Sequence, residues 1–165
     1  MNEVFLLLGS NLGDRQLNIN SAISLLEKYV GKQIALSMCY ETEPWGNENQ
    51  PYFLNQCIKL LTPLEPFEVL EKCQFIESQL KRIKSQKWGA RIIDIDILLF
   101  NNEVIKNENL TIPHRDFHKR KFALVCLNDI ASDCYHPLLN KKISELLNTC
   151  KDNLSVNVSL NLTIN

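Results

Sequence analysis

Residues 88–100 constrain the fold of this chain more than any other stretch, because they predict a β-strand that carries two acids. Alternate side chains of a strand share a face, so Asp94 and Asp96 project side by side. At about 3.3 Å per residue their Cα atoms lie about 6.6 Å apart, close enough for both carboxylates to hold divalent cations. The other residues divide between the two faces: Ile93, Ile95, Ile97 and Leu99 on one, and Ile92 and Leu98 with the acids on the other.

The residues alone leave two interpretations of this acidic pair open. Acids two positions apart on a strand often form the solvated face of a half-buried sheet. The alternative is a metal site, since Ile92 and Leu98 make the face around the acids apolar. Adjacent buried carboxylates repel each other and take up protons unless a cation lies between them. The choice between the two depends on the rest of the chain.

The composition is that of an ordinary globular domain. The chain has 165 residues, 45% of them hydrophobic and 22% charged, with a formal net charge of -1. This balance argues against a nucleic-acid binder that relies on phosphate contacts. The apolar run at 4–8 is short and follows an acid, and no later run approaches membrane length, so we expect a cytoplasmic protein without membrane contact. Six scattered cysteines indicate neither zinc nor a redox couple.

Hydrophobic spacing predicts strands and helices in a regular order before the acidic strand. Asp14 is the predicted N-cap of a helix that ends near Val30, and Gly31 is its predicted left-handed terminating residue. In the strand at 53–61, Phe53 and Asn55 share the face opposite to Leu54. The predicted elements are strands at 4–8, 34–40 and 53–61, helices at 15–30 and 66–83, and a loop at 42–52.

This order predicts an α+β fold with a ferredoxin-like βαββαβ core, in which the first strand lies between the third and the fourth. Asn101 and Asn102 predict a hairpin into residues 103–105 that gives the acidic strand an outer neighbour and makes it interior. We expect one domain at 1–150, with added helices at about 117–130 and 143–150.

The tail at 151–165 is predicted to form a strand, since its side chains alternate strictly between apolar and polar from 154 to 164. The apolar face of such a strand has to be covered. We therefore expect the tail to pack on the domain or on a partner chain, with a monomer as the first expectation and a dimer through the tail as the second.

An ordered set of short motifs connects the chain to a known family. The motifs are Gly-Ser-Asn-Leu-Gly-Asp at 9–14, Tyr-Glu-Thr-Glu-Pro at 40–44, Asn-Gln-Pro-Tyr-Phe-Leu-Asn at 49–55, residues 77–82, Trp-Gly-Ala-Arg at 88–91, Asp-Ile-Asp at 94–96 and Leu-Thr-Ile-Pro-His at 110–114. In order and spacing they resemble the 6-hydroxymethyl-7,8-dihydropterin pyrophosphokinases over about residues 1–130. The resemblance implies transfer of pyrophosphate from ATP to the pterin alcohol, which gives AMP and is a step of folate biosynthesis.

The resemblance also implies a role for particular residues. Asp94 and Asp96 would hold two Mg²⁺ ions, and Arg82 and Arg91 would clamp the phosphates and complete the catalytic set. The implied ATP-binding residues are Gln74, Glu77, Lys84, Trp88, Arg91, Ile97, Thr111, His114, Arg115 and Arg120. The implied pterin-binding residues are Thr42, Glu43, Trp45, Gly46, Phe53, Asn55, Asp94 and Phe122.

Three residues depart from the family pattern, and other readings of the chain remain. Lys84 and Arg115 stand where relatives carry arginine and tyrosine, and Phe53 stands where tyrosine is frequent. By composition alone, Phe53 and Phe122 are core residues.

The competing functions are a metal-dependent glycosyltransferase, a ferredoxin-like RNA-binding module and an interaction domain. Release of AMP from ATP and the pterin alcohol distinguishes the pyrophosphokinase from these.

Overall fold

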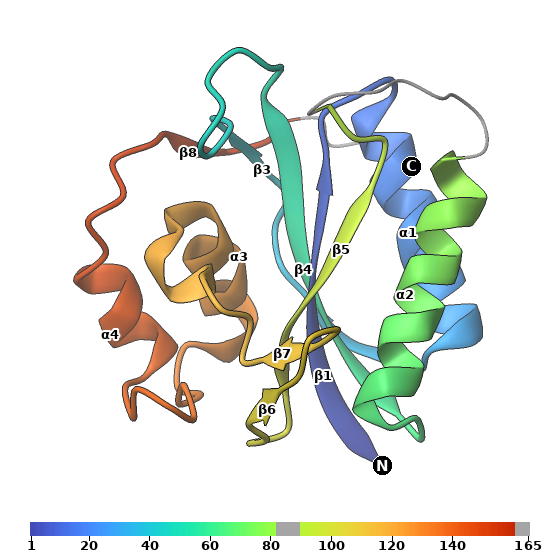
Figure 1. The fold of residues 1–165 in the computed structure, drawn as a ribbon. Coiled ribbons are helices and arrows are strands. Elements are labelled where there is room, and N and C mark those ends of the chain that lie inside the picture. The colour runs from blue at the N-terminus through green and yellow to red at the C-terminus, as the bar shows by residue number, and fades with distance from the viewer. Residues whose placement is uncertain (82–89, 161–165) are drawn as a thin grey trace.

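A computed structural model describes residues 1–81 and 90–160. An antiparallel sheet stands between two pairs of helices, with α1 and α2 on one face and α3 and α4 on the other (Figure 1). The strands are β1 Asn2–Ser10, β2 Lys32–Leu36, β3 Tyr40–Thr42, β4 Phe53–Thr62, β5 Asp94–Phe100 and β8 Val156–Val158, and β6 Ile105–Lys106 and β7 Thr111–Ile112 form a small separate sheet. The helices are α1 Arg15–Tyr29, α2 Pro66–Lys81, α3 Lys121–Ala131 and α4 Ile143–Asn148, with a 3-10 helix at Phe117–Lys119.

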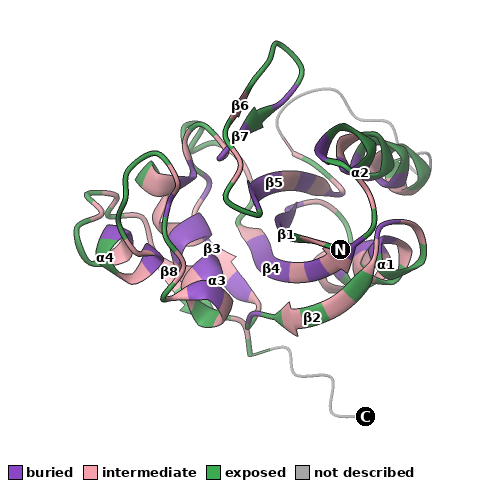
Figure 2. Ribbon diagram, turned by 90° about the horizontal axis from the view of Figure 1, so that it is seen from below, coloured by how far each residue is buried: buried purple, intermediate pink, exposed green. Residues whose placement is uncertain are grey.

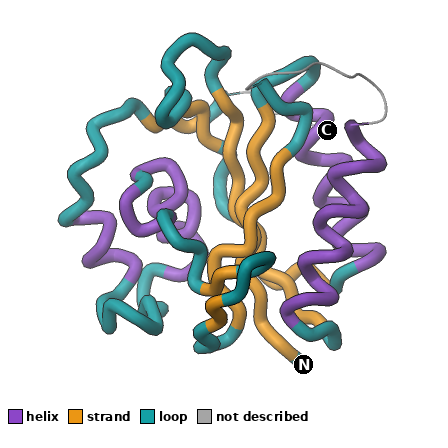
Figure 3. The backbone as a smooth tube through the Cα atoms, viewed as in Figure 1, coloured by secondary structure: helices purple, strands orange, loops and turns teal. Residues whose placement is uncertain are grey.

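The strand order is β5-β1-β4-β3-β8, with β2 also paired to β4. The first strand therefore lies between the third and the fourth predicted strands, which confirms the ferredoxin-like arrangement (Figure 3). The predicted start of α1 is also confirmed, because the Asp14 side chain accepts a hydrogen bond from the Leu17 backbone N–H at 3.0 Å.

The central strand β1 separates two hydrophobic cores. Val4 and Leu6 face α1 and α2, whereas Phe5 and Leu7 face α3 and α4, and all four are almost fully buried. Each such side chain contributes about 1.5–3 kcal/mol when it leaves water. The sheet is therefore buried on both faces, and exposed residues lie on the outer sides of the helices (Figure 2).

The acidic strand is shorter and less regular than predicted. It begins at Asp94, although Arg91 already forms hydrogen bonds with Asn11 before the strand starts. Its pairing with β1 shifts by one residue between Ile97 and Leu99. This β-bulge puts Leu98 and Leu99 into the same core, so the prediction that Leu99 shares a face with Ile97 is wrong.

The prediction that residues 103–105 make β5 interior is also wrong: within residues 1–81 and 90–160, β5 is the last strand of the sheet. After the turn at Asn101, the chain leads away from β5. Its next strand, β6, pairs with β7. Two hydrogen bonds satisfy part of the free edge of β5. The Glu77 carboxylate accepts the Ile95 N–H at 2.8 Å, and the His114 N–H donates to the Leu98 carbonyl at 3.0 Å.

The strand predicted at 34–40 is interrupted. β2 ends at Leu36 and β3 begins at Tyr40. The reason is Ser37, whose hydroxyl accepts the Cys57 backbone N–H at 2.9 Å in place of a strand carbonyl. Ile34, Leu36 and Met38 are exposed, although their alternation is typical of a buried face.

Residues 156–158 of the tail form β8 on the outer edge of β3. The Ser159 N–H extends this pairing with a hydrogen bond of 2.8 Å to the Cys39 carbonyl. None of the helices within the described ranges is long and apolar enough to cross a membrane.

Gly31 has a different role from the predicted one. The described glycines with positive φ are Gly13 and Gly46, so Gly31 is not a left-handed terminating residue. Instead, a Cβ atom at this position would collide with the Leu61 carbonyl oxygen. Glycine is needed here because α1 ends against the backbone of β4.

We expect Gly31→Ala to lower the free energy of unfolding by about 1–3 kcal/mol, since the backbone has to move to accept the methyl group. Urea denaturation measures the loss. Lys32→Ala at the adjacent exposed position is the control and should leave the midpoint unchanged. Equal midpoints for Gly31→Ala and the control would contradict the steric explanation.

Truncation after Cys150 should lower the melting temperature, because it removes β8 and exposes the edge of β3. In a domain of this size, each kcal/mol lost from the free energy of unfolding lowers the melting temperature by about 2–4 °C. Differential scanning calorimetry gives the value. An unchanged melting temperature would mean that β8 adds nothing to the stability of the sheet.

Candidate active site

Two cavities meet at the acidic pair. The inner pocket has a volume of about 210 Å³ and is lined by Leu7, Gly9, Thr42, Glu43, Trp45, Gln50, Phe53, Asn55, Arg91, Asp94, Asp96, Arg120 and Phe122. The outer pocket, of about 330 Å³, is lined by Leu70, Ile95, Asp96, Ile97, Asn109, Leu110, Thr111, His114, Arg115, Asp116 and Arg120. Asp96 and Arg120 line both pockets and therefore stand between them.

The structure gathers most, but not all, of the predicted site residues. Every predicted pterin-binding residue except Gly46 lines the inner pocket. Of the predicted nucleotide-binding residues, five line the outer pocket (Ile97, Thr111, His114, Arg115 and Arg120), while Arg91 lines the inner one. Gln74 and Glu77 line neither pocket, and Arg82, Lys84 and Trp88 lie outside the described residues.

The two acids share one face of β5 but differ in their surroundings. Asp94 pairs with Gly9 of β1 and Asp96 with Leu7, so both carboxylates face the inner pocket. Burial raises the pKa of Asp96 to about 7, and the negative charge of Asp94 acts in the same direction. The positive charge of Arg120 opposes this rise.

Arg91 neutralises part of the acidic pair. Its Nη1 lies 2.8 Å from Oδ2 of Asp94. Its backbone is fixed from the other side, because the Arg91 N–H donates to Oδ1 of Asn11 at 2.7 Å and the Asn11 N–H donates to the Arg91 carbonyl at 3.0 Å. The Arg91 side chain is about half exposed, so it can exchange Asp94 for another anion without disturbing the fold.

Glu77 is a structural neighbour of the acidic pair. Because its carboxylate accepts the Ile95 N–H, it holds the free edge of β5 between the two acids. Burial raises the pKa of Glu77, and the hydrogen bond from Ile95 acts in the opposite direction. Gln74, which precedes Glu77 on α2, is exposed.

Asn55 has a fixed orientation at the bottom of the inner pocket. Its amide nitrogen donates to Oγ1 of Thr42 at 2.7 Å. Gly9 makes room for its other amide atom, since a Cβ at Gly9 would lie 2.9 Å from Oδ1 of Asn55. Gly9, Leu7 and Gln50 are lining residues that sequence reasoning missed, although Gly9 begins one of the recognised motifs.

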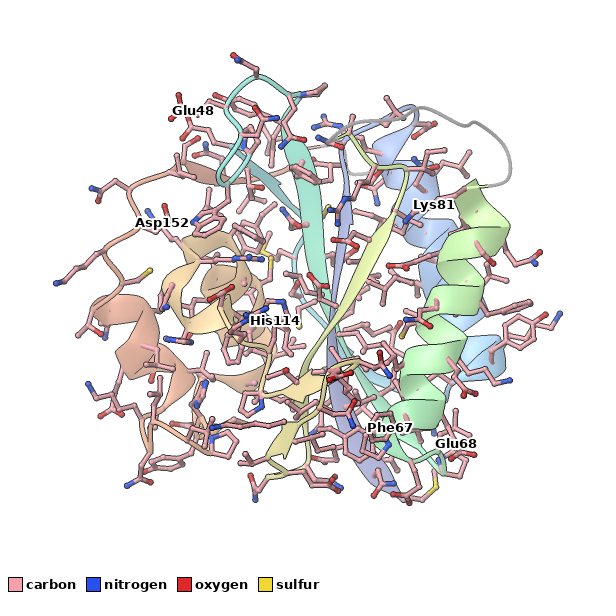
Figure 4. All side chains as sticks on the ribbon, in the orientation of Figure 1. Glu48, Phe67, Glu68, Lys81, His114 and Asp152 are labelled. Carbon is pink, nitrogen blue, oxygen red and sulfur yellow. The ribbon has the colours of Figure 1, made fainter. Side chains whose placement is uncertain are left out.

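Hydrogen bonds with Asp152 and Ser155 of the tail support two walls of the inner pocket. The Lys121 N–H, the first of α3, donates to Oδ2 of Asp152 at 2.9 Å. Figure 4 shows Asp152 beside α3. The Ser155 N–H donates to Oε2 of Glu43 at 2.7 Å, and the Glu43 N–H donates to the Ser155 carbonyl at 3.2 Å. The sequence pattern of the tail gives no sign of these contacts.

His114 (labelled in Figure 4) lies beside β5, where its backbone N–H donates to the Leu98 carbonyl at 3.0 Å. Its Nδ1 accepts the Asp116 N–H at 3.2 Å, so the neutral ring carries its proton on Nε2. Burial lowers the pKa of His114, and the positive charge of Arg120 lowers it further. His114 is therefore a neutral donor at the outer pocket near pH 7.

The described residues contain no preformed metal cage. Within 1–81 and 90–160, no group of three or more histidine, cysteine, aspartate or glutamate side chains is arranged to hold a metal ion. The acidic pair supplies two carboxylates only. Such a pair resembles the Mg²⁺ sites that take their remaining ligands from water and substrate phosphates.

Comparisons with known proteins identify the family of this chain. Residues 5–132 match the family described as 7,8-dihydro-6-hydroxymethylpterin-pyrophosphokinase (HPPK). The chain is 42% identical over 130 residues to the 2-amino-4-hydroxy-6-hydroxymethyldihydropteridine pyrophosphokinase of Bacillus subtilis, which covers 78% of each chain. It is 35% identical to the protein of the same name from Haemophilus influenzae, over 94% of this chain and 97% of that one.

A solved structure shares the fold. It is the Plasmodium falciparum HPPK-DHPS chain with pterin and p-hydroxybenzoate, with a TM-score of 0.72 and 25% identity. The match covers 89% of this chain but only 42% of the longer Plasmodium chain. The similarity therefore concerns less than half of that protein.

We expect Asp96→Asn to stabilise the metal-free protein at pH 8 and to have little effect near pH 4. The pKa of Asp96 is about 7 in the fold against 3.8 in the unfolded chain, so the folded state binds more protons between these values. Stability is then lost as the pH rises through this window. Thermal unfolding in chelator across pH 4–8 measures it, with Glu71→Gln at an exposed position of α2 as the control. A gain that is the same at pH 4 and pH 8 would contradict this origin.

Proposed function

Because this chain belongs to the 7,8-dihydro-6-hydroxymethylpterin-pyrophosphokinase family, we propose that its inner pocket holds the pterin and its outer pocket holds ATP. The protein is an ATP-dependent pyrophosphokinase of folate biosynthesis. The observation that carries the proposal is that Asp96 and Arg120 line both pockets. The reacting groups of the two substrates would therefore meet beside the acidic pair.

The inner pocket has the groups that a flat, polar bicycle requires. Phe53 and Phe122 supply ring surfaces for stacking on the pterin. Because Thr42 already engages the amide nitrogen of Asn55, Oδ1 of Asn55 is the atom that would accept a pterin N–H. Stacking and edge contacts together would orient the hydroxymethyl group toward Asp94 and Asp96.

The outer pocket combines apolar and cationic side chains, as a nucleotide requires. Leu70, Ile97 and Leu110 offer apolar surface for the adenine base. The polyphosphate would lie near Arg115 and Arg120, whose guanidinium groups donate several hydrogen bonds to phosphate oxygens. His114 would add a neutral N–H donor, which does not titrate away between pH 7 and pH 8.

Asp94 and Asp96 fit Mg²⁺ by their chemistry. Both ligands are carboxylate oxygens, which hard divalent cations prefer. Burial and the negative charge of Asp94 both raise the pKa of Asp96, so a cation bound between the two acids would favour the ionised form of Asp96. When bound, two Mg²⁺ ions would neutralise phosphate charge and polarise the oxygens that react.

Arg91 would change partners during the reaction. In the structure it forms an ion pair with Asp94, and it would leave that pair when Asp94 serves as a metal ligand. The freed guanidinium would then bind the phosphoryl group as its charge is redistributed in the transition state. Arg82, Lys84 and Trp88 remain proposed ATP contacts from the family resemblance alone.

We expect Asp94→Ala and Asp96→Ala each to reduce the rate of AMP formation by more than about 100-fold. Loss of a residue that only contacts a metal ligand typically costs about 10- to 100-fold, and loss of the ligand itself should cost more. The assay follows AMP and ADP released from ATP and 6-hydroxymethyl-7,8-dihydropterin at saturating Mg²⁺. Asp133→Ala, an exposed acid outside both pockets, is the control. Near-wild-type turnover of either variant would remove the two-metal assignment.

A further inference from the structure

Trp45 and Arg120 form a contact that links the two pockets. The guanidinium carbon of Arg120 lies 4.5 Å from the centre of the Trp45 ring, a typical cation–π distance. Trp45 belongs to the loop between β3 and β4, which borders the inner pocket. Arg120 immediately precedes α3 and borders both pockets.

Arg120 has few other interactions that would fix its orientation. Its Nη2 lies 3.7 Å from Oδ2 of Asp116, which is a long ion pair. Its buried Nε has no hydrogen-bond partner among the described residues. The Trp45 ring is therefore the main surface against which the Arg120 guanidinium rests.

The geometry of a cation–π contact leaves Arg120 able to bind an anion. The ring attracts the flat face of the guanidinium, whereas the N–H groups lie along its edge. An arginine held in this way can donate those N–H groups to phosphate oxygens without leaving the ring. The contact thus orients Arg120 and keeps its donors available.

The loop that carries Trp45 is anchored two residues earlier, at Glu43. Glu43 forms two hydrogen bonds with the backbone of Ser155, one through its carboxylate and one through its N–H. Pro44 is buried between Glu43 and Trp45. The loop therefore enters the pocket from an anchored position, and Trp45 can transmit that position to Arg120.

We propose that Trp45 is a positioning residue for the nucleotide as well as a wall of the pterin pocket. It holds the Arg120 guanidinium with its N–H edge ready for the ATP phosphates. The inference rests on the proposed assignment of the outer pocket to ATP. It also implies positive coupling: because linkage is reciprocal, phosphates that engage Arg120 favour the loop arrangement that borders the pterin pocket.

The decisive measurement is ATP-analogue affinity in the absence of pterin. We expect Trp45→Leu to raise the Kd of a non-hydrolysable ATP analogue with Mg²⁺ by about three- to tenfold, as loss of a half-exposed cation–π contact implies. Trp45→Phe retains an aromatic face and should restore most of the affinity. Phe67→Leu is the matched control, since Phe67 is an aromatic residue of α2 that is similarly exposed and lines neither pocket. Melting temperatures verify that each variant is folded.

A double-mutant cycle with Arg120→Met tests the route of the effect. If Trp45 acts through Arg120, Trp45→Leu should have little further effect in the Arg120→Met background. An equal loss in both backgrounds, no loss in the wild type, or a gain in affinity would each overturn the inference. If Arg120→Met itself leaves analogue binding unchanged, the outer pocket is not the ATP site, and the failure lies with the proposed function.

Discussion

The fold depends on how β5 carries two carboxylates at the edge of a sheet. An edge strand has unpaired backbone groups on its outer side, and here the Glu77 carboxylate and the His114 N–H satisfy two of them. These two groups take the place of a further strand. They hold the outer edge of β5 and leave space beside it. The outer pocket occupies this space, with Ile95 and Ile97 in its lining. An interior β5 would have closed the outer pocket with a neighbouring strand.

Regular periodicity made much of the fold predictable from sequence. The buried run of β1, the Asp14 cap and the face shared by Phe53 and Asn55 all follow from spacing along one element. The errors came from interactions between elements. Ser37 replaces a strand carbonyl with its hydroxyl, and the bulge at Leu98 changes which core receives Leu99. Neither effect leaves a periodic signal in the sequence.

The composition of the pockets was partly predictable for the same reason. Asp94 and Asp96 share a face because they lie two residues apart on a strand, which is local information. That Gly9 lies opposite Asn55, or that Asp152 caps α3, depends on pairing between distant segments. Glu77 shows the limit of motif reasoning: the residue belongs to a recognised motif, yet its contact in the structure is to the backbone of β5.

The contacts of the tail bear on the order in which the molecule is completed during synthesis. Asp152 and Ser155 support α3 and the Glu43 loop, and both are translated after every residue that lines the two pockets. A domain generally folds as a unit. A nascent chain that ends before residue 152 contains β1 to β5 but lacks both β8 and the carboxylate that accepts the first N–H of α3. The walls of the inner pocket can therefore reach their final arrangement only after the tail has been synthesised.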